Sequence, residues 1–162
     1  MVLLTLALSA QAEPEVRVEP DGEVVGVTVI EATPADVRNV LASASTIGEL
    51  SPDVLDVTTE AEGRCVRVDR KTKGLFRPLR LFARRCPTQR GWREELIEPG
   101  DFATYSSEWI VVPDGNGTRV EYRVETTLDL PVPGSAVRAG LVRSTRTMLQ
   151  NLIRRVTRPA PR

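Results

Sequence analysis

The sequence of 162 residues contains no histidine. Imidazole is the usual general base near neutral pH and the commonest metal ligand in proteins, so its absence argues against a triad hydrolase and against a zinc enzyme. Cysteine is also scarce, because Cys65 and Cys86 are the only two and they do not form a Cys-x-x-Cys motif. Two thiols without histidine make a poor metal site, whereas a disulfide between them fits an oxidising compartment. We therefore expect a structural disulfide, no metal and no cofactor.

The chain also lacks any apolar run long enough to span a bilayer. The run at residues 2–10 is short and uncharged, and Ala10-Gln11-Ala12 follows it as a small-x-small cleavage pattern. We predict a signal peptide over residues 1–12, with Glu13 as the first mature residue, and a secreted or periplasmic location. No lysine or arginine precedes the apolar run, so a buried N-terminal strand or helix is the alternative.

The chain has no overall excess of positive or negative charge, because Lys+Arg and Asp+Glu are balanced at 22 each. Basic residues are nevertheless concentrated: residues 64–93 contain eleven of them and a single acid, Asp69. This segment is either a solvated convex face of the fold or a docking surface for an acidic partner. Nucleic acid is not expected as the partner, because the net charge is zero and export would separate the protein from it.

Apolar periodicity predicts one strand, two short helices, six further strands and a long C-terminal helix. The first strand spans residues 23–31, where β-branched residues dominate. Thr33 is suited to cap the helix that follows, with Asp36 as the acid of a capping box, and a second helical turn covers residues 46–50. The six later strands are expected to form a meander of hairpins at residues 54–61, 64–72, 79–86, 92–98, 103–112 and 118–129. The last helix spans residues 135–156, where apolar residues recur at helical spacing.

Hairpin register predicts which side chains face inward. A symmetric turn at residues 74–78 places Cys65 opposite Cys86, close enough for a disulfide that would stabilise the fold by roughly 3 kcal/mol. Propagating this register gives an inward face that is apolar and aromatic with a few polar groups. Its members are Leu55, Val57, Thr59, Val66, Val68, Arg70, Leu81, Ala83, Arg85, Trp92, Glu94, Leu96, Tyr105, Ser107, Trp109, Val111, Val120, Tyr122 and Val124. The C-terminal helix is expected to lie across this face.

Two segments and the order of the elements carry a family resemblance. Residues 27–37 (VTVIEATPADV) look like a strand followed by a proline-started helix, and residues 47–52 (IGELSP) look like the loop after a second helix. Over about residues 24–156 the chain resembles bacterial members of the helix-grip superfamily. This superfamily (the SRPBCC type) includes START lipid-transfer domains, Bet v 1-like proteins, polyketide cyclases and coenzyme-Q-binding proteins.

The resemblance implies an α+β helix-grip domain over residues 23–157. Such a domain has a seven-stranded curved antiparallel sheet around a long C-terminal helix, with two short helices after the first strand. Residues 13–22 would then be a polar lead-in, and residues 158–162 a loose tail.

In such folds the sheet and the long helix enclose an apolar cavity whose mouth lies at one end. Mapped onto this chain, the mouth would hold Leu75, Phe76 and Phe102, beside the loops at residues 51–52 and 132–133. The basic hairpin around this apolar tip is suited to peripheral contact with an anionic membrane. The cavity itself would be lined by Arg70, Leu81, Trp92, Glu94, Tyr105, Trp109, Tyr122, Met148 and Leu152.

Three functions are compatible with these patterns. The first is an exported, monomeric protein that binds or transfers a lipid or other hydrophobic small molecule, with the four large aromatic residues as cavity wall or simply as core. The second is a cyclase-like enzyme in which Glu94, flanked by Arg70 and Arg85, is the acid/base group, unless these residues form a structural ion pair. The third is a protein-interaction module that uses the basic hairpin. Binding without catalysis is the function we favour.

Overall fold

The computed structural model describes residues 10–158. The apolar part of the predicted signal peptide, at residues 1–9, lies outside the described residues, as does all but the first residue of the predicted tail at residues 158–162. Every other predicted element can be compared with the structure. None of the helices in the described range is both long and apolar enough to cross a bilayer.

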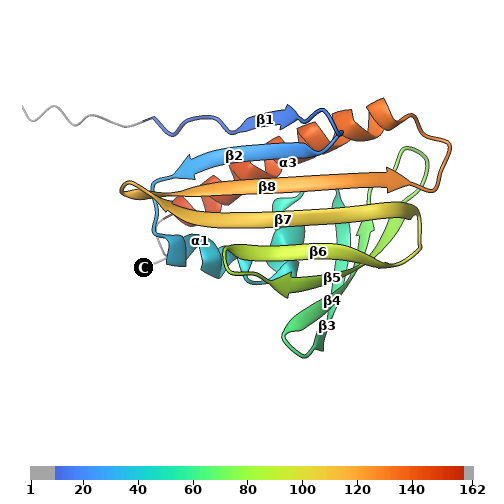
Figure 1. Cartoon of the computed structure of the whole chain (residues 1–162), viewed down its shortest axis with the longest axis horizontal. Coiled ribbons are helices and arrows are strands. Elements are labelled where there is room, and N and C mark those ends of the chain that lie inside the picture. Colours follow the sequence, from blue (N-terminus) through green and yellow to red (C-terminus); the bar gives the residue numbers. More distant parts are fainter. Residues whose placement is uncertain (1–9, 159–162) are drawn as a thin grey trace, which may run out of the picture.

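A single antiparallel sheet curves around the longest helix (Figure 1). The strands follow the order β1-β2-β8-β7-β6-β5-β4-β3 across the sheet. Their bounds are β1 Glu15–Val18, β2 Val24–Ile30, β3 Val54–Glu62, β4 Cys65–Thr72, β5 Leu79–Pro87, β6 Gly91–Glu98, β7 Phe102–Asp114 and β8 Gly117–Leu128. The helices are α1 Pro34–Leu41, α2 Ala44–Leu50 and α3 Gly134–Thr157. The predicted α+β helix-grip architecture is therefore confirmed.

The sheet has eight strands among the described residues instead of the seven predicted. The additional strand, β1, lies in the segment that we expected to be a polar lead-in, and it pairs antiparallel with β2 from Glu15 to Val18. Val16 packs against the main core, so the short Glu-Val-Arg-Val alternation hides one apolar side chain and covers the edge of β2. A period-two pattern over so few residues gives a weak signal.

Local sequence sets both short helices. The side chain of Thr33 accepts a hydrogen bond from the backbone N–H of Asp36 at 3.1 Å and donates one to its carboxylate at 2.8 Å. The side chain of Ser43 caps α2 in the same way, through the N–H of Thr46. This second cap starts α2 two residues before the predicted turn.

The predicted hairpin register is confirmed across β4 to β8. Val66 lies opposite Arg85, Arg70 lies opposite Leu81, and the disulfide Cys65–Cys86 closes the same ladder. Leu55, which was predicted to face inward, is 48 % exposed, because a bulge between Val54 and Asp56 turns it outward. Thr59 keeps its predicted register opposite Val68 but is exposed at the edge of the sheet.

The main core lies under the C-terminal half of α3. Its buried residues come from β2, β7, β8 and all three helices, with Leu149 and Leu152 fully buried. Gly26 of β2 lets α3 approach closely, because a Cβ atom there would lie 2.6 Å from Thr145 Cγ2 and 2.7 Å from Leu149 Cδ1. A second, smaller cluster on β5 and β7 contains Leu79, Leu81, Ala83 and Phe102.

Candidate functional site

A cavity of about 680 Å³ separates the sheet from the N-terminal half of α3. Strands β4 to β8 supply its inner wall, and Val137, Leu141 and Met148 face it from α3. None of residues 134–144 is buried, whereas the next turns of α3 pack into the main core. The cavity therefore lies along the part of α3 where side chains such as Leu141 and Val142 reach the core and stay only partly buried.

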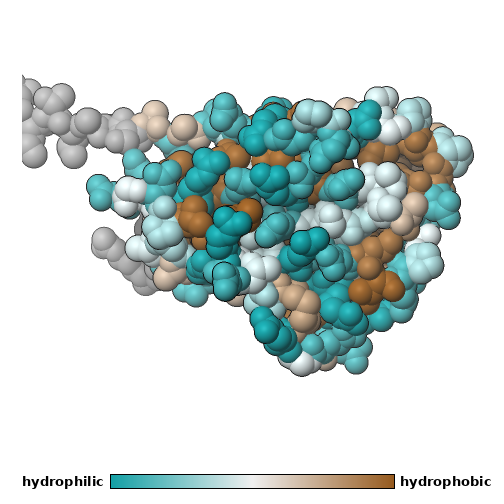
Figure 2. Space-filling model, in the orientation of Figure 1, coloured by the Kyte–Doolittle hydropathy of each residue, from teal (hydrophilic) through white to brown (hydrophobic). Residues whose placement is uncertain are grey.

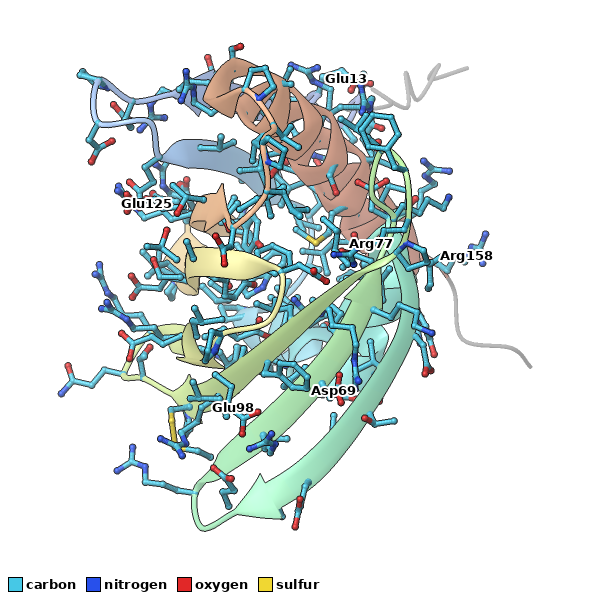
Figure 3. All side chains as sticks on the ribbon, turned by 90° about the vertical axis from the view of Figure 1, so that its right-hand side faces the viewer. Glu13, Asp69, Arg77, Glu98, Glu125 and Arg158 are labelled. Carbon is cyan, nitrogen blue, oxygen red and sulfur yellow. A yellow bond between two sulfur atoms is a disulfide. The ribbon has the colours of Figure 1, made fainter. Side chains whose placement is uncertain are left out.

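The cavity has its apolar rim on the loop between β4 and β5. Leu75 is 73 % exposed and Phe76 is 96 % exposed, and both line the cavity entrance together with Val132. Figure 3 looks onto this end of the molecule, with Arg77 marking the hairpin beside α3. Figure 2 shows hydrophobic residues exposed toward the same end, on the right. An exposed phenylalanine has no partner within the described part of the chain, so this tip needs an explanation beyond folding.

A polar network forms one wall inside the cavity. Nη2 of Arg70 donates to both carboxylate oxygens of Glu94, at 3.0 and 3.1 Å, and both side chains are at least nine-tenths buried. Tyr105 donates its hydroxyl to Glu94 Oε2 at 2.9 Å and accepts from Arg70 Nη1 at 3.3 Å. Ser107 Oγ lies 3.0 Å from the same hydroxyl. The inward register predicted from the cysteines has brought these four side chains together.

In this network the attraction between opposite charges opposes the effect of burial on the pKa values. Burial alone would raise the pKa of Glu94, but the cations Arg70 and Arg85 and the hydrogen bond from Tyr105 outweigh burial and lower it. Burial likewise opposes the charge of Arg70, yet the interactions with Glu94, Tyr105 and Tyr122 together outweigh burial and raise the pKa of Arg70. Burial and the charge of Glu94 raise the pKa of Tyr105 to about 12. Glu94 is therefore an ionised acceptor at neutral pH, and Tyr105 is a protonated donor.

Arg85 belongs to this polar network but not to the cavity wall. It lies opposite Glu94 in the β5–β6 ladder, is 3 % exposed, and donates from Nη2 to the carbonyl oxygen of Leu41, the last residue of α1. Its guanidinium carbon is 5.0 Å from the centre of the Trp92 ring. The C-terminal end of a helix, with its free carbonyl groups, attracts a cation, and this attraction helps to hold Arg85 in place.

Most of the residues predicted to bind a ligand do line the cavity. They are Arg70, Leu81, Glu94, Tyr105, Trp109, Tyr122 and Met148, and the predicted mouth residues Leu75, Phe76 and Phe102 line it as well. Their contact with a ligand stays a prediction.

Three positions differ from the predicted arrangement. Trp92 lies away from the cavity wall, half-buried beneath Arg85 and against the main core. Leu152 is fully buried in that core, because it belongs to the half of α3 that packs tightly. Phe102 is only 8 % exposed and packs edge-to-face on Tyr105, so it lies in the wall and not at the exposed rim.

The structure also adds residues that were not predicted as site residues. Ser107 holds Tyr105, and Leu141 and Val137 form the helical side of the cavity. Ser107 was on the predicted inward face, so its register was a usable signal. The role of Leu141 was not readable, because helical periodicity does not say which apolar residues meet a void. Within the described residues no group of three or more acids or cysteines could hold a metal ion.

Comparison with known proteins agrees with this geometry. Residues 21–157 match the sequence profile of the family described as polyketide cyclase / dehydrase and lipid transport. No curated protein matches the chain in sequence.

Solved structures share the fold at low sequence identity. A START superfamily protein from Mycobacterium smegmatis has a TM-score of 0.72 at 16% identity, over 83% of this chain and 96% of that one. A STAR-related lipid transfer protein from Xanthomonas axonopodis has a TM-score of 0.70 at 16% identity, over 91% of this chain and 100% of that one. The Zhui aromatase/cyclase from a Streptomyces species has a TM-score of 0.59 at 18% identity, over 88% and 87% of the two chains.

Proposed function

Since this chain belongs to the polyketide cyclase / dehydrase and lipid transport family, we propose that it binds and carries a lipid or another apolar small molecule between its sheet and α3. The cavity is the observation that carries this proposal. Its volume of about 680 Å³ falls within the range of pockets that enclose small-molecule ligands. Its walls are mainly apolar, with one compact polar network, which is the composition such pockets have.

Binding without catalysis is better supported than a cyclase-like activity. A general acid needs a proton near neutral pH, but the pKa of Glu94 is lowered below its ordinary value. Both oxygens of Glu94 are also occupied by Arg70, and one of them by Tyr105. A carboxylate held in this way stabilises the wall of a site and is poorly placed to exchange protons with a substrate.

The rim residues support contact with an anionic membrane. Leu75 and Phe76 are the most exposed large apolar side chains of the described chain, and Lys71 and Lys73 flank them. Arg77 and Arg143 line the same cavity as the rim residues, and the first turns of α3 contain no acid. Apolar side chains ringed by cations match the interface of a bilayer with anionic lipids. A docked rim would let the ligand pass between membrane and cavity without crossing water.

Export is part of the same proposal. The disulfide Cys65–Cys86 is of the kind that persists in oxidising compartments, and the sequence of residues 1–12 has the pattern of a cleaved signal. Expression of the full chain in a bacterium, followed by fractionation and N-terminal sequencing of the mature protein, tests this. Mature protein that begins at Glu13 in the periplasm or medium supports export, and uncleaved protein in the cytoplasm contradicts it.

The ligand proposal is tested by native mass spectrometry of the purified protein and by organic extraction of what copurifies. We expect a bound apolar molecule. Leu141→Trp fills the cavity from α3 and should release the bound molecule, whereas Arg154→Trp places the same side chain on an exposed position in the C-terminal half of α3 and should not. A protein that copurifies with nothing and takes up no added lipid would overturn the proposal.

Membrane contact is tested by co-sedimentation with vesicles that contain phosphatidylglycerol. Phe76→Ser should abolish most of the binding of the wild type, and added salt should weaken it. Val29→Ser is the matched control, because Val29 is also an exposed apolar residue but lies opposite Arg119 at the start of β8, at the end of the sheet away from the cavity. Equal losses in both variants, or binding that ignores vesicle charge, would exclude a specific docking rim.

A further inference from the structure

The buried polar network has hydrogen-bond donors without acceptors. Among the described residues, the buried side-chain atoms without any partner include Nε of Arg70 and both Nε and Nη1 of Arg85. All three are guanidinium donors, on β4 for Arg70 and on β5, the strand next to that of Glu94, for Arg85. Buried polar groups are rarely left unpaired in folded proteins, because each one costs the free energy of removing it from water. In this network the acceptors therefore have donors, whereas three N–H donors have no acceptor.

Glu94 does not supply the missing acceptors. Its two oxygens already accept from Arg70, and Oε2 also accepts from Tyr105. Arg85 lies opposite Glu94 in the ladder, yet it forms no hydrogen bond with the carboxylate and reaches the carbonyl oxygen of Leu41 instead. Adding acceptors at this place would thus require another molecule.

The charge of the network is unbalanced in the same direction. Arg70 and Arg85 are two buried cations, and Glu94 is the only buried acid among the residues that the structure describes. The carbonyl end of α1 offsets part of the excess charge through Arg85, but a helix terminus is equivalent to only about half a charge. In a medium of low dielectric constant the remaining positive potential favours a negative group nearby.

We propose that the carried molecule is an amphiphile with an anionic, carboxylate-like head, which lies against Arg70 inside the cavity while its apolar tail runs toward the rim at Phe76. This inference rests on the proposed function and adds the chemical class of the ligand. Arg70 lines the cavity, and its Nη1 carries two N–H groups but has one acceptor, the hydroxyl of Tyr105, so Arg70 is the group that touches the head. Arg85 lies outside the wall and contributes its charge at longer range.

The test compares three ligands of equal chain length, namely dodecanoate, dodecanol and methyl dodecanoate, at neutral pH and below their aggregation concentrations. Trp109 lines the cavity, so its fluorescence reports binding. We expect dodecanoate to bind about tenfold more tightly than the alcohol, as one charge-assisted hydrogen bond would produce. Equal binding of the three overturns the anionic head, because a buried water then supplies the acceptor. Binding of none, with nothing copurifying, overturns the carrier function itself.

Two substitutions of the network should move this preference in opposite directions. Glu94→Gln removes the negative charge that faces Arg70, so the ratio of the dissociation constants of alcohol and acid should rise. Arg85→Met removes a positive charge without touching the cavity wall, so that ratio should fall. Loosening of the structure would weaken both ligands alike and leave the ratio unchanged. A ratio that stays constant in Glu94→Gln, which keeps an acceptor for Arg70, contradicts the proposal even if Arg85→Met does not fold.

Discussion

The two halves of α3 differ in how they pack against the sheet, although they form one continuous helix. The C-terminal half buries Thr145, Met148, Leu149, Leu152 and Ile153 against the sheet. The N-terminal half, residues 134–144, buries none of its residues and borders the cavity. We call these the packed half and the hollow half.

The ends of α3 differ in the same way. Arg154 and Arg155 lie in the last turn, where cations stabilise the helix dipole. At the other end no side chain caps the helix, and no acid lies in the first turn. The comparison shows that the buried contacts of α3 begin where the cavity ends along the helix: Thr145 and Met148 lie at its margin, and Leu149, Leu152 and Ile153 pack beyond it. No residue of the hollow half is buried, and a buried ion pair lies in the sheet beneath it.

The largest effect is expected from breaking that ion pair. Arg70→Met leaves Glu94 buried and uncompensated, which should lower the free energy of unfolding by about 3–5 kcal/mol at neutral pH. Chemical denaturation measures the change. Arg67→Met is the control, because Arg67 pairs with the exposed Glu98 on the outer face and should matter little. A tolerated Arg70→Met would mean that the hollow half needs no polar support.

The pH dependence of that variant has a definite sign. In the wild type the pKa of Glu94 is lowered on folding, so ionised Glu94 stabilises the fold above the unfolded pKa. That contribution is lost as the pH falls toward the folded value. In Arg70→Met the buried carboxylate loses this cation and can become neutral by protonation, so the difference from wild type should shrink at about pH 4. A difference that is independent of pH would contradict the assigned charge of Glu94.

Two leucines of α3 provide the most direct contrast between the halves. Leu149→Ala opens a void in the packed half and should cost about 2–5 kcal/mol of stability. Leu141→Ala enlarges a cavity that already exists, so it should cost much less and should weaken ligand binding instead. Thermal unfolding and a ligand titration on both variants separate the two effects. Equal losses of stability would show that the halves are not energetically distinct.

The contact of β2 with the packed half is tested by Gly26→Ala. The added methyl group would press on Thr145 and Leu149 at distances that real Cβ atoms do not adopt, so the helix or the strand must shift. We expect a loss of about 1–3 kcal/mol, measured by denaturant unfolding. An unchanged stability would mean that α3 can move away from β2 freely.

The smallest expected effect is a gain in the hollow half. A Cβ atom at Gly140 would meet nothing within 4 Å, so Gly140→Ala fits there and stabilises the helix. The gain should be about 0.5–1 kcal/mol, seen as a higher unfolding midpoint. If ligand release also becomes slower, the looseness of this half serves entry and exit. A destabilised variant would show that the helix in this region is constrained in a way the contacts do not reveal.

Much of the fold was predictable because short-range rules apply to it. The two cysteines fixed the register of one hairpin, and the pleat then carried the inward face to Glu94, Tyr105 and Trp109. The same rule failed for Leu55, since a bulge adds one residue to a strand without any mark in the sequence. The strand β1 was missed because its four residues contain only one side chain that the core receives.

The site was predictable only in part. Trp92 and Leu152 were on the correct inward faces but do not line the cavity, because the void ends before it reaches them. Periodicity tells which face of an element a residue belongs to and gives no information on what lies opposite that face.

The sequence by itself determined the order of the elements, the caps of the two short helices, the hairpin register and the disulfide. These depend on residues close together in the chain or paired across one turn. Only the tertiary structure decided that α3 packs along one half and spans a cavity along the other. The reason is that a cavity is the difference between two surfaces, here the inner face of β4 to β8 and one side of α3, and no single segment of the chain encodes that difference.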